Sequence, residues 1–195
     1  MTISEVVQKY LEHIDMILDN PNEKNLVLPI SIDDLPIPNC NSSTDFEDDV
    51  LKSLDFVIAS IHSSFSQPRE TIMERLKTAL NNPHVDIIAH PTGRIIGRRT
   101  GYDVDIEMLI ELARETNTAL ELNANPNRLD LAPPHLRKAQ EAGVPIVINT
   151  DAHSIDMLEH MPVGVSSAKK GWVKESTVLN ARDTDGLLAF LKRND

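Results

Sequence analysis

The sequence predicts an α/β fold in which a largely parallel sheet is covered by helices. From residue 55 onward, short apolar segments alternate with longer segments whose apolar residues recur at helical spacing. The short segments are apolar throughout, which is typical of parallel strands that are buried on both faces. Neither a GxGxxG nor a Walker A glycine pattern follows any of them, which argues against a Rossmann or P-loop nucleotide-binding protein.

This alternation defines the expected elements in order. Pro68 opens a helix, because proline is favoured in the first turn, and Gly143 ends another, because glycine is favoured just after a helix. A short apolar run at 163–166 is interpreted as a last strand. The expected strands cover 56–61, 85–89, 119–122, 145–149 and 163–166, and the expected helices begin at 68 and cover 103–115, 133–142 and 184–192.

The N-terminal part of the chain follows a different pattern. An amphipathic helix is expected over 2–21, where apolar residues recur at helical spacing. A strand is expected at 26–32, although Pro29 makes it an unusual one. The stretch 33–45 is rich in Pro, Asn, Ser and Asp and is expected to be a loop.

The length favours one domain, and the charge argues against a general nucleic-acid binder. The 195 residues suffice for one sizeable core and are few for two. We therefore expect a single domain over 1–195, with a divergent segment at 1–54 and the regular core at 55–195. The formal charge is −11, and residues 1–55 carry 12 acids and 3 bases. A general nucleic-acid binder usually shows a basic face, which this composition offers only locally, around 94–99.

The sequence gives no sign of a membrane or an oxidising compartment. No apolar run approaches the roughly 20 residues that a bilayer span needs. The lone Cys40 excludes an intramolecular disulfide. We expect a cytoplasmic protein without a membrane partner.

Polar residues follow the apolar strands at corresponding places. His62 and His90 follow two strands, Glu121 lies at the end of the third, and Asp151 and His153 follow the fourth. Carboxyl ends of parallel strands meet at one rim, where barrel enzymes have their active sites. Imidazole and carboxylate together suit a hydrolytic metal site. A single strand-end histidine is more often structural, so the prediction depends on the repetition over four strands.

Other candidates are weaker. Four histidines on expected helices or turns are interpreted as surface residues: His13, His84, His135 and His160. The loop HPTGRIIGRR places Arg94 after the His90 strand, where its guanidinium would bind phosphate oxygens or simply cap a helix. Asn123 would orient a ligand or cap a turn. No nucleophile elbow surrounds Ser63 and Ser64, and Cys40 has no histidine nearby in sequence, so covalent catalysis is not expected.

Five segments in order carry a family resemblance: DFVIASIHSSF, IIAHPTGR, ELNANPNRLDL, INTDAH and VGVSSAKKGW. They resemble the C-terminal PHP (polymerase and histidinol phosphatase) domain of bacterial and archaeal family X DNA polymerases. The resemblance implies a distorted, TIM-like seven-stranded βα barrel that acts as a metal-dependent phosphoesterase with zinc or manganese. It also implies that His62, His90, Asp151 and His153 are metal ligands, and it leaves Arg94, Glu121 and Asn123 as catalytic candidates.

The chain also departs from the family pattern. The opening H-x-H motif and the first barrel strands are missing, and Ser31 stands where the bridging glutamate is expected. The barrel is therefore expected to be partial, and the occupancy of Zn²⁺ or Mn²⁺ to be low, since even catalytic zinc sites normally supply three protein ligands.

Three hypotheses remain open at this point. The chain is a phosphatase or 3'-5' exonuclease that acts on a phosphorylated small molecule or a nucleic-acid end. Alternatively, it is a PHP module without catalysis that serves as a scaffold or binds a partner. In the third, a second copy or another chain covers the open barrel edge and supplies the missing ligands.

Overall fold

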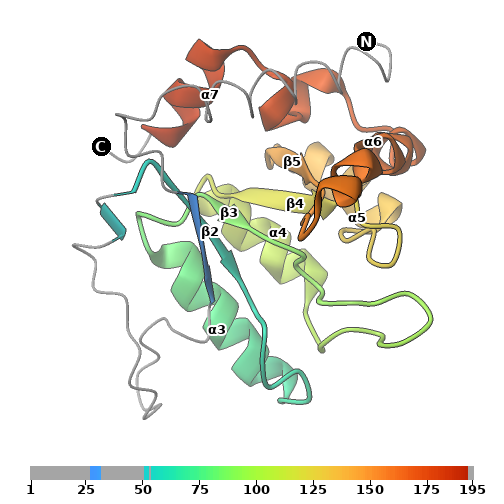
Figure 1. The fold of residues 1–195 in the computed structure, drawn as a ribbon. Helices are drawn as coiled ribbons and strands as arrows, with labels where there is room; N and C mark the ends of the chain where they lie inside the picture. The colour runs from blue at the N-terminus through green and yellow to red at the C-terminus, as the bar shows by residue number, and fades with distance from the viewer. Residues whose placement is uncertain (1–26, 32–50, 53, 193–195) are drawn as a thin grey trace.

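The computed structural model describes residues 27–31, 51–52 and 54–192 (Figure 1). Five parallel strands form one sheet in the order of the chain, so each crossover advances to the next strand in the same direction. This order is compatible with a section of a βα barrel. The α/β class and the parallel sheet are confirmed. The strands are β1 (Val27–Ser31), β2 (Phe56–Ser60), β3 (Ile87–Ile88), β4 (Ala119–Asn123) and β5 (Ile146–Asn149).

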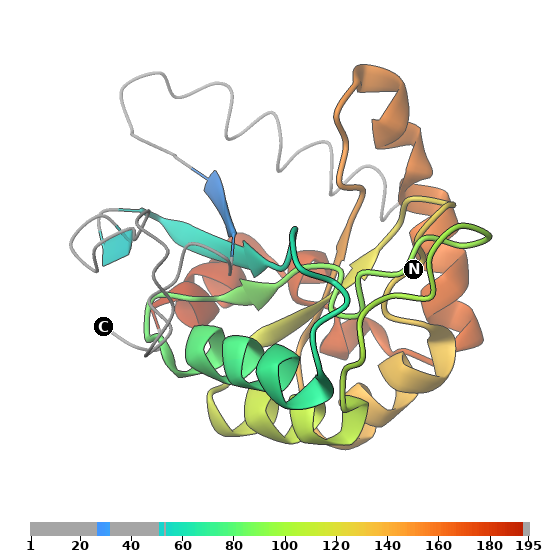
Figure 2. The ribbon, with the colours of Figure 1, turned by 90° about the horizontal axis from the view of Figure 1, so that it is seen from below.

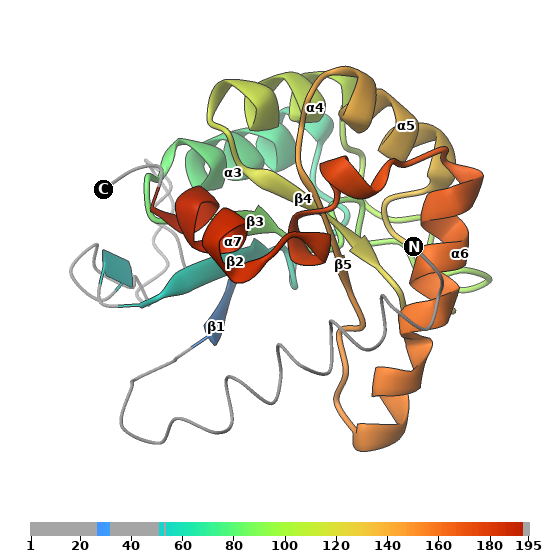
Figure 3. The same cartoon turned by 90° about the horizontal axis from the view of Figure 1, so that it is seen from above.

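Helices cover both faces of this sheet. The described part of the chain contains α3 (Arg69–Asn81), α4 (Ile106–Glu115), α5 (Pro133–Glu141), α6 (Met161–Lys170) and α7 (Thr184–Leu191), with the short 3-10 segments η2 (Ile155–His160), η3 (Glu175–Thr177) and η4 (Leu179–Ala181). Figure 3 shows α3, α4, α5 and α6 as an outer layer and α7 on the opposite side of the strands.

Side chains alternate between these two faces along each strand. On β4, Leu120 and Leu122 pack in the main core beneath the outer helices, whereas Ala119 packs in a second cluster with Phe190 of α7. Glu121 and Asn123 lie two and four positions after Ala119, so they are on the same face of the strand as Ala119. The second face is therefore apolar where α7 covers it and becomes polar towards the carboxyl ends of the strands.

The N-terminal strand expected at 26–32 is confirmed as β1. It pairs with β2 in parallel, with Ser31 opposite Ser60. Within the described residues β1 is an edge strand, and proline is confined mostly to such strands because they pair with a neighbour on one side only. The expected helix over 2–21 and the expected loop over 33–45 lie outside the described residues.

One element prediction is wrong. Residues 163–166 form part of helix α6, not a strand. The buried positions of α6 include Met161, Gly164, Val165 and Ala168, which recur at helical spacing. The predicted strand rested on four residues only, and an apolar run that short fits a helix as well as a strand. The strand expected at 85–89 is confirmed in position but pairs only over Ile87–Ile88.

Gly164 is the point where α6 approaches the sheet most closely. A Cβ atom added there would lie 2.5 Å from the Ala124 Cβ and 2.9 Å from the Ile148 Cγ2. We expect Gly164→Ala to lower the free energy of unfolding by about 1–3 kcal/mol, because overpacking outweighs the better helix propensity of alanine. Urea denaturation measures the change. Ser166→Ala on the exposed side of α6 is the control and is expected to stay within about 0.5 kcal/mol. A more stable Gly164→Ala protein would contradict this packing of α6.

Candidate functional site

The residues predicted at the strand ends lie at one rim of the sheet. Segments that follow β2 and β3 run beside each other there (Figure 2), and Phe65 of the first contacts the second, with its ring 6.0 Å from that of Tyr102. Arg99 lies above the same Phe65 ring at 3.8 Å. This stacking joins the loop that carries His62 to the loop that carries His90.

His62 and His90 form the first part of the rim. Their ring centroids are 5.3 Å apart and the rings meet edge to face. The His62 side chain is exposed, and Ser60 Oγ lies 3.1 Å from its Nε2. His90 is buried, and among the described residues its Nδ1 has no hydrogen-bond partner. One buried imidazole nitrogen is thus free to bind a ligand beside a second imidazole.

Backbone geometry turns two rim residues out of their strands. His90 follows β3 with φ 31°, and Asp151 follows β5 with φ 52°. Residues other than glycine rarely adopt this left-handed region, at a cost of about 1–3 kcal/mol each. Strained backbone of this kind clusters at active sites and ligand sites. The strain at both strand ends therefore supports a functional rim.

His90 is uncharged at neutral pH. Burial, and to a lesser extent the positive charge of Arg128, lower its pKa from 6.5 to about 4, and the carboxylate of Asp151 opposes this shift. A neutral imidazole keeps one nitrogen lone pair available, which is the form that metal ions and hydrogen-bond donors require.

The buried carboxyl of Glu121 on β4 hydrogen-bonds to the segment after β3 and to β5. Its Oε2 accepts a hydrogen bond from the His90 N–H at 2.7 Å, and its Oε1 accepts one from Asn149 Nδ2 at 3.1 Å. Burial raises the pKa of this carboxyl from 4.5 to about 8, although both hydrogen bonds favour the charged form. Glu121 therefore holds the backbone at His90 and links β4 to β5. Its predicted catalytic role stays a prediction.

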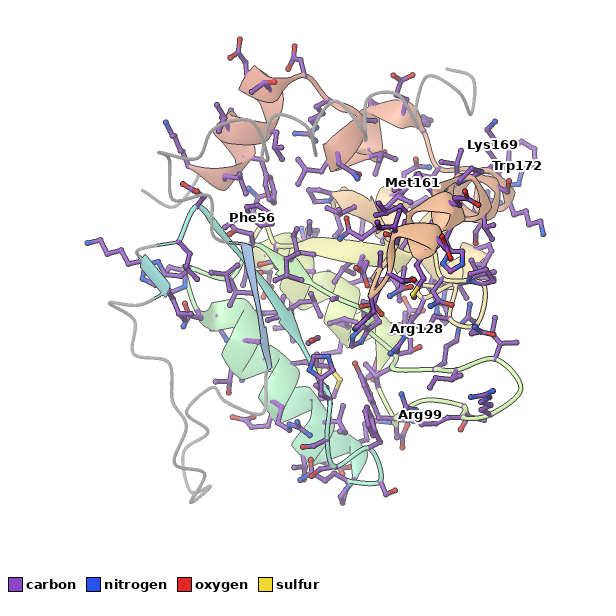
Figure 4. The ribbon with its side chains drawn as sticks, viewed as in Figure 1. Phe56, Arg99, Arg128, Met161, Lys169 and Trp172 are labelled. Carbon is purple, nitrogen blue, oxygen red and sulfur yellow. The ribbon has the colours of Figure 1, made fainter. Side chains whose placement is uncertain are left out.

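Arg128 is a rim residue that sequence reasoning missed. Its Nε lies 3.4 Å from Asp151 Oδ2, and the same oxygen accepts a hydrogen bond from Asn123 Nδ2 at 3.1 Å. The Arg128 NH1 nitrogen is buried and has no partner among the described residues. The signal for Arg128 is its place in the segment ELNANPNRLDL, which carries part of the family resemblance. Figure 4 shows Arg128 between the strand ends and the loops.

The structure places Arg94 behind the rim. Its Nε donates to the carbonyl oxygen of Arg128 at 2.8 Å, and its NH2 donates to the carbonyl oxygen of Leu129. These bonds fix the backbone on which the Arg128 side chain is carried. Arg99, on the same loop, donates to the Gly93 carbonyl oxygen at 2.9 Å. The phosphate-binding role predicted for Arg94 is not tested by these contacts, which use its donors for support.

The remaining histidines are placed differently from one another. His153 is exposed, and its Nδ1 lies 2.8 Å from the Asp151 carbonyl oxygen. His84, His135 and His160, predicted as surface residues, all keep part of their surface exposed but are half-buried. Burial also lowers the pKa of His135. Helical and turn positions alone did not indicate how closely α5 and η2 pack on their neighbours. His13 lies outside the described residues.

The rim fits a zinc or manganese ion in the kind of its donors. Two imidazoles lie together, and one of them has a buried nitrogen without a partner. The number of donors is too small, however. Among residues 27–31, 51–52 and 54–192, no three His, Cys, Asp or Glu side chains lie close enough together to hold a metal ion. Ser31 lies at the carboxyl end of β1, one strand away from Ser60 and His62.

Comparison with known proteins finds relatives named as a DNA polymerase/3'-5' exonuclease and as probable phosphatases. The chain is 56% identical over 192 residues to the DNA polymerase/3'-5' exonuclease PolX of Bacillus subtilis (strain 168), which is 98% of this chain and 33% of that protein. It is 35% identical over 118 residues to a probable phosphatase of Caldanaerobacter subterraneus subsp. tengcongensis, which is 56% of this chain and 44% of that protein. No protein-family profile matches the sequence.

A second probable phosphatase, from Thermoanaerobacter sp. (strain X514), is 31% identical over 161 residues, or 76% of this chain and 61% of that protein. The chain therefore spans about a third of the polymerase and about half of the two phosphatases. Within the described residues, none of the helices combines the length and the apolar composition that crossing a membrane requires.

The buried carboxyl of Glu121 predicts a pH dependence of stability. Because its pKa is about 8 in the folded protein and 4.5 ordinarily, the folded state binds more protons than the unfolded chain between these pH values. Stability contributed by Glu121 is therefore lost as the pH rises towards 8. His90 has its pKa lowered from 6.5 to about 4, so its contribution to stability is lost as the pH falls below 6.5.

We expect Glu121→Gln to flatten the fall in the free energy of unfolding between pH 6.5 and 8 by up to about 1.4 kcal/mol per pH unit. Urea denaturation at several pH values, with a chelator present, measures this slope. Glu111→Gln is the control, because Glu111 is an exposed residue paired with Arg114. Equal slopes for Glu121→Gln and the wild type would contradict a protonated Glu121.

Proposed function

We propose that the chain is a PHP-type phosphoesterase module that hydrolyses phosphate esters at the rim formed by His62, His90, Asp151 and Arg128. The observation that carries the proposal is the pairing of two imidazoles with a guanidinium whose NH1 has no partner among the described residues. Relatives named as phosphatases and as a 3'-5' exonuclease support the same chemistry. We further propose that the sheet is part of a PHP-type barrel.

The rim residues suit a doubly charged phosphate ester. The planar guanidinium of Arg128 matches phosphate oxygens and is 21% exposed in its side chain, so a substrate can approach it. Asp151 is 26% exposed, and Asn123 holds one of its oxygens. Asp151 thereby keeps Arg128 in place until a phosphate group competes for the guanidinium.

His90 and His62 would supply the nitrogen ligands of a zinc or manganese ion. When bound, such an ion lowers the pKa of a water molecule and so provides the nucleophile for hydrolysis. The low pKa of His90 keeps its imidazole neutral at physiological pH. Glu121 holds the His90 backbone through its N–H, so the ring keeps its position beside His62.

The first test joins metal content to activity. Protein purified without a chelator is expected to contain zinc or manganese by elemental analysis and to hydrolyse p-nitrophenyl phosphate when Mn²⁺ is added. The double variant His62→Ala, His90→Ala is expected to lose both. His84→Ala, whose histidine lies in a turn away from the rim, is the control and keeps both. Less than about a tenth of an equivalent of metal together with no hydrolysis would overturn the proposal.

The second test concerns Arg128. We expect Arg128→Met to reduce kcat/KM for a phosphate ester by about 10- to 100-fold, because one hydrogen bond to a charged group is worth about 1.5–3 kcal/mol. Initial rates with added Mn²⁺ measure the loss. Arg114→Met removes an exposed arginine of α4 and is expected to leave the rate unchanged. An unchanged rate in Arg128→Met would remove this residue from the site.

A further inference from the structure

A second surface lies at the end of α6, away from the rim. Trp172 is the only tryptophan of the chain, and its side chain is 75% exposed. Ten residues of α6, about 15 Å of helix, separate it from the segment that follows Asp151. Figure 4 shows Trp172 beside Lys169 at this corner of the molecule, apart from Arg128. Its indole offers a large flat apolar face with a polar N–H, a combination that is enriched at binding surfaces.

The Trp172 loop is held in place by α5. Gln140 Nε2 donates to the Trp172 carbonyl oxygen at 3.0 Å, and Gln140 Oε1 accepts from the Lys174 N–H at 2.6 Å and from Thr177 Oγ1 at 3.0 Å. Trp172 itself has φ 59°, in the left-handed region. Three hydrogen bonds from one side chain therefore fix a strained loop. The backbone that carries the indole is preorganised, so a partner would lose little affinity to ordering this loop.

Positive charge surrounds the exposed ring. Lys169, Lys170 and Lys174 are exposed within three positions of Trp172. A depression of about 400 Å³ adjoins the ring and is lined by Arg137, Gln140, Glu141, Trp172 and Lys174. We name these residues, with Lys169 and Lys170, the Trp172 patch. Arg137 is paired with Glu141 at 2.9 Å, and the three lysines have one further acid nearby in sequence, Glu175, so the local balance is +2 on a chain with a net charge of −11.

We propose that the Trp172 patch binds single-stranded nucleic acid. An unpaired base would stack on the indole, and the flanking phosphates would contact the lysines, which is how proteins bind single strands without reading sequence. A duplex hides the faces of its bases and could use only the lysines. A symmetric contact between two copies would bring the same positive patches face to face, which is unfavourable. This binding requires neither a metal nor hydrolysis, so it goes beyond the proposed function.

The fluorescence of the single tryptophan tests stacking directly. Titration with an oligothymidylate of about 12 nucleotides is expected to quench Trp172 fluorescence to saturation. Heparin, a polyanion without bases, is expected to leave the fluorescence nearly unchanged, and so is duplex DNA. Equal quenching by heparin would overturn the proposal, because it would mean that charge alone produces the signal. Absence of quenching by the oligonucleotide would overturn it as well.

Variants separate the two contributions. With a fluorescein-labelled oligonucleotide followed by anisotropy, Trp172→Ala is expected to weaken binding about 5- to 150-fold, the loss of one stacked base. The double variant Lys169→Met, Lys174→Met is expected to reduce the slope of log K against log salt by about 1.4, since each phosphate contact contributes about 0.7 for a single strand. Circular dichroism checks that each variant is folded.

Controls come from the same chain. Ile155→Ala removes an apolar side chain that is 85% exposed, and Lys77→Met removes an exposed base of α3. Both are expected to bind the oligonucleotide as the wild type does. Wild-type affinity in Trp172→Ala would overturn the proposal. So would dimers of the wild type that disappear in Trp172→Ala without nucleic acid, because the patch would then be an interface between copies of the chain.

Discussion

The rim depends on the buried carboxyl of Glu121. This side chain lies in the middle of β4 yet bonds the backbone of His90 after β3 and the amide of Asn149 on β5. β3 pairs over only two residues, so its short ladder fixes the position of His90 weakly. The Glu121 bond compensates for that, because it holds His90 in a left-handed conformation that the ladder alone would not impose. Burial of the carboxyl, and with it the protonated state, is the energetic cost of this arrangement.

A second set of hydrogen bonds positions Arg128, which carries the positive charge of the rim. Arg94 bonds the carbonyl oxygens of Arg128 and Leu129, and Asp130 accepts the Thr92 N–H at 3.0 Å, so the loops after β3 and β4 hold each other. Asn123 and Asp151 then align the Arg128 side chain from the sheet side. An arginine that the sequence predicts to bind phosphate thus supports the backbone of another arginine.

The sequence predicted the rim because strand ends are readable from it. A histidine or carboxylate directly after an apolar strand has a fixed direction, so His62, His90 and Asp151 could be placed together before any coordinates. Arg128 could not, because its position depends on a loop with Leu129 at φ 45° and on hydrogen bonds from Arg94, which lies 34 positions before it in sequence. The wrong prediction at 163–166 has a related cause. Four residues contain less than two helical turns, so they do not show whether their apolar positions recur at helix or at strand spacing.

Three side chains share one structural role in this chain. Glu121, Arg94 and Gln140 each reach from one element to backbone groups of another, and each fixes a loop that strand pairing does not reach. Each such bond contributes only about 0.5–3 kcal/mol to folding, yet it decides where a functional side chain lies. Because the bonds at the rim and the bonds of Gln140 share no residue, the geometry of the Trp172 patch does not depend on that of the rim. The binding proposed for one surface and the chemistry proposed for the other are therefore expected to be lost separately, as for well-separated sites without shared partners.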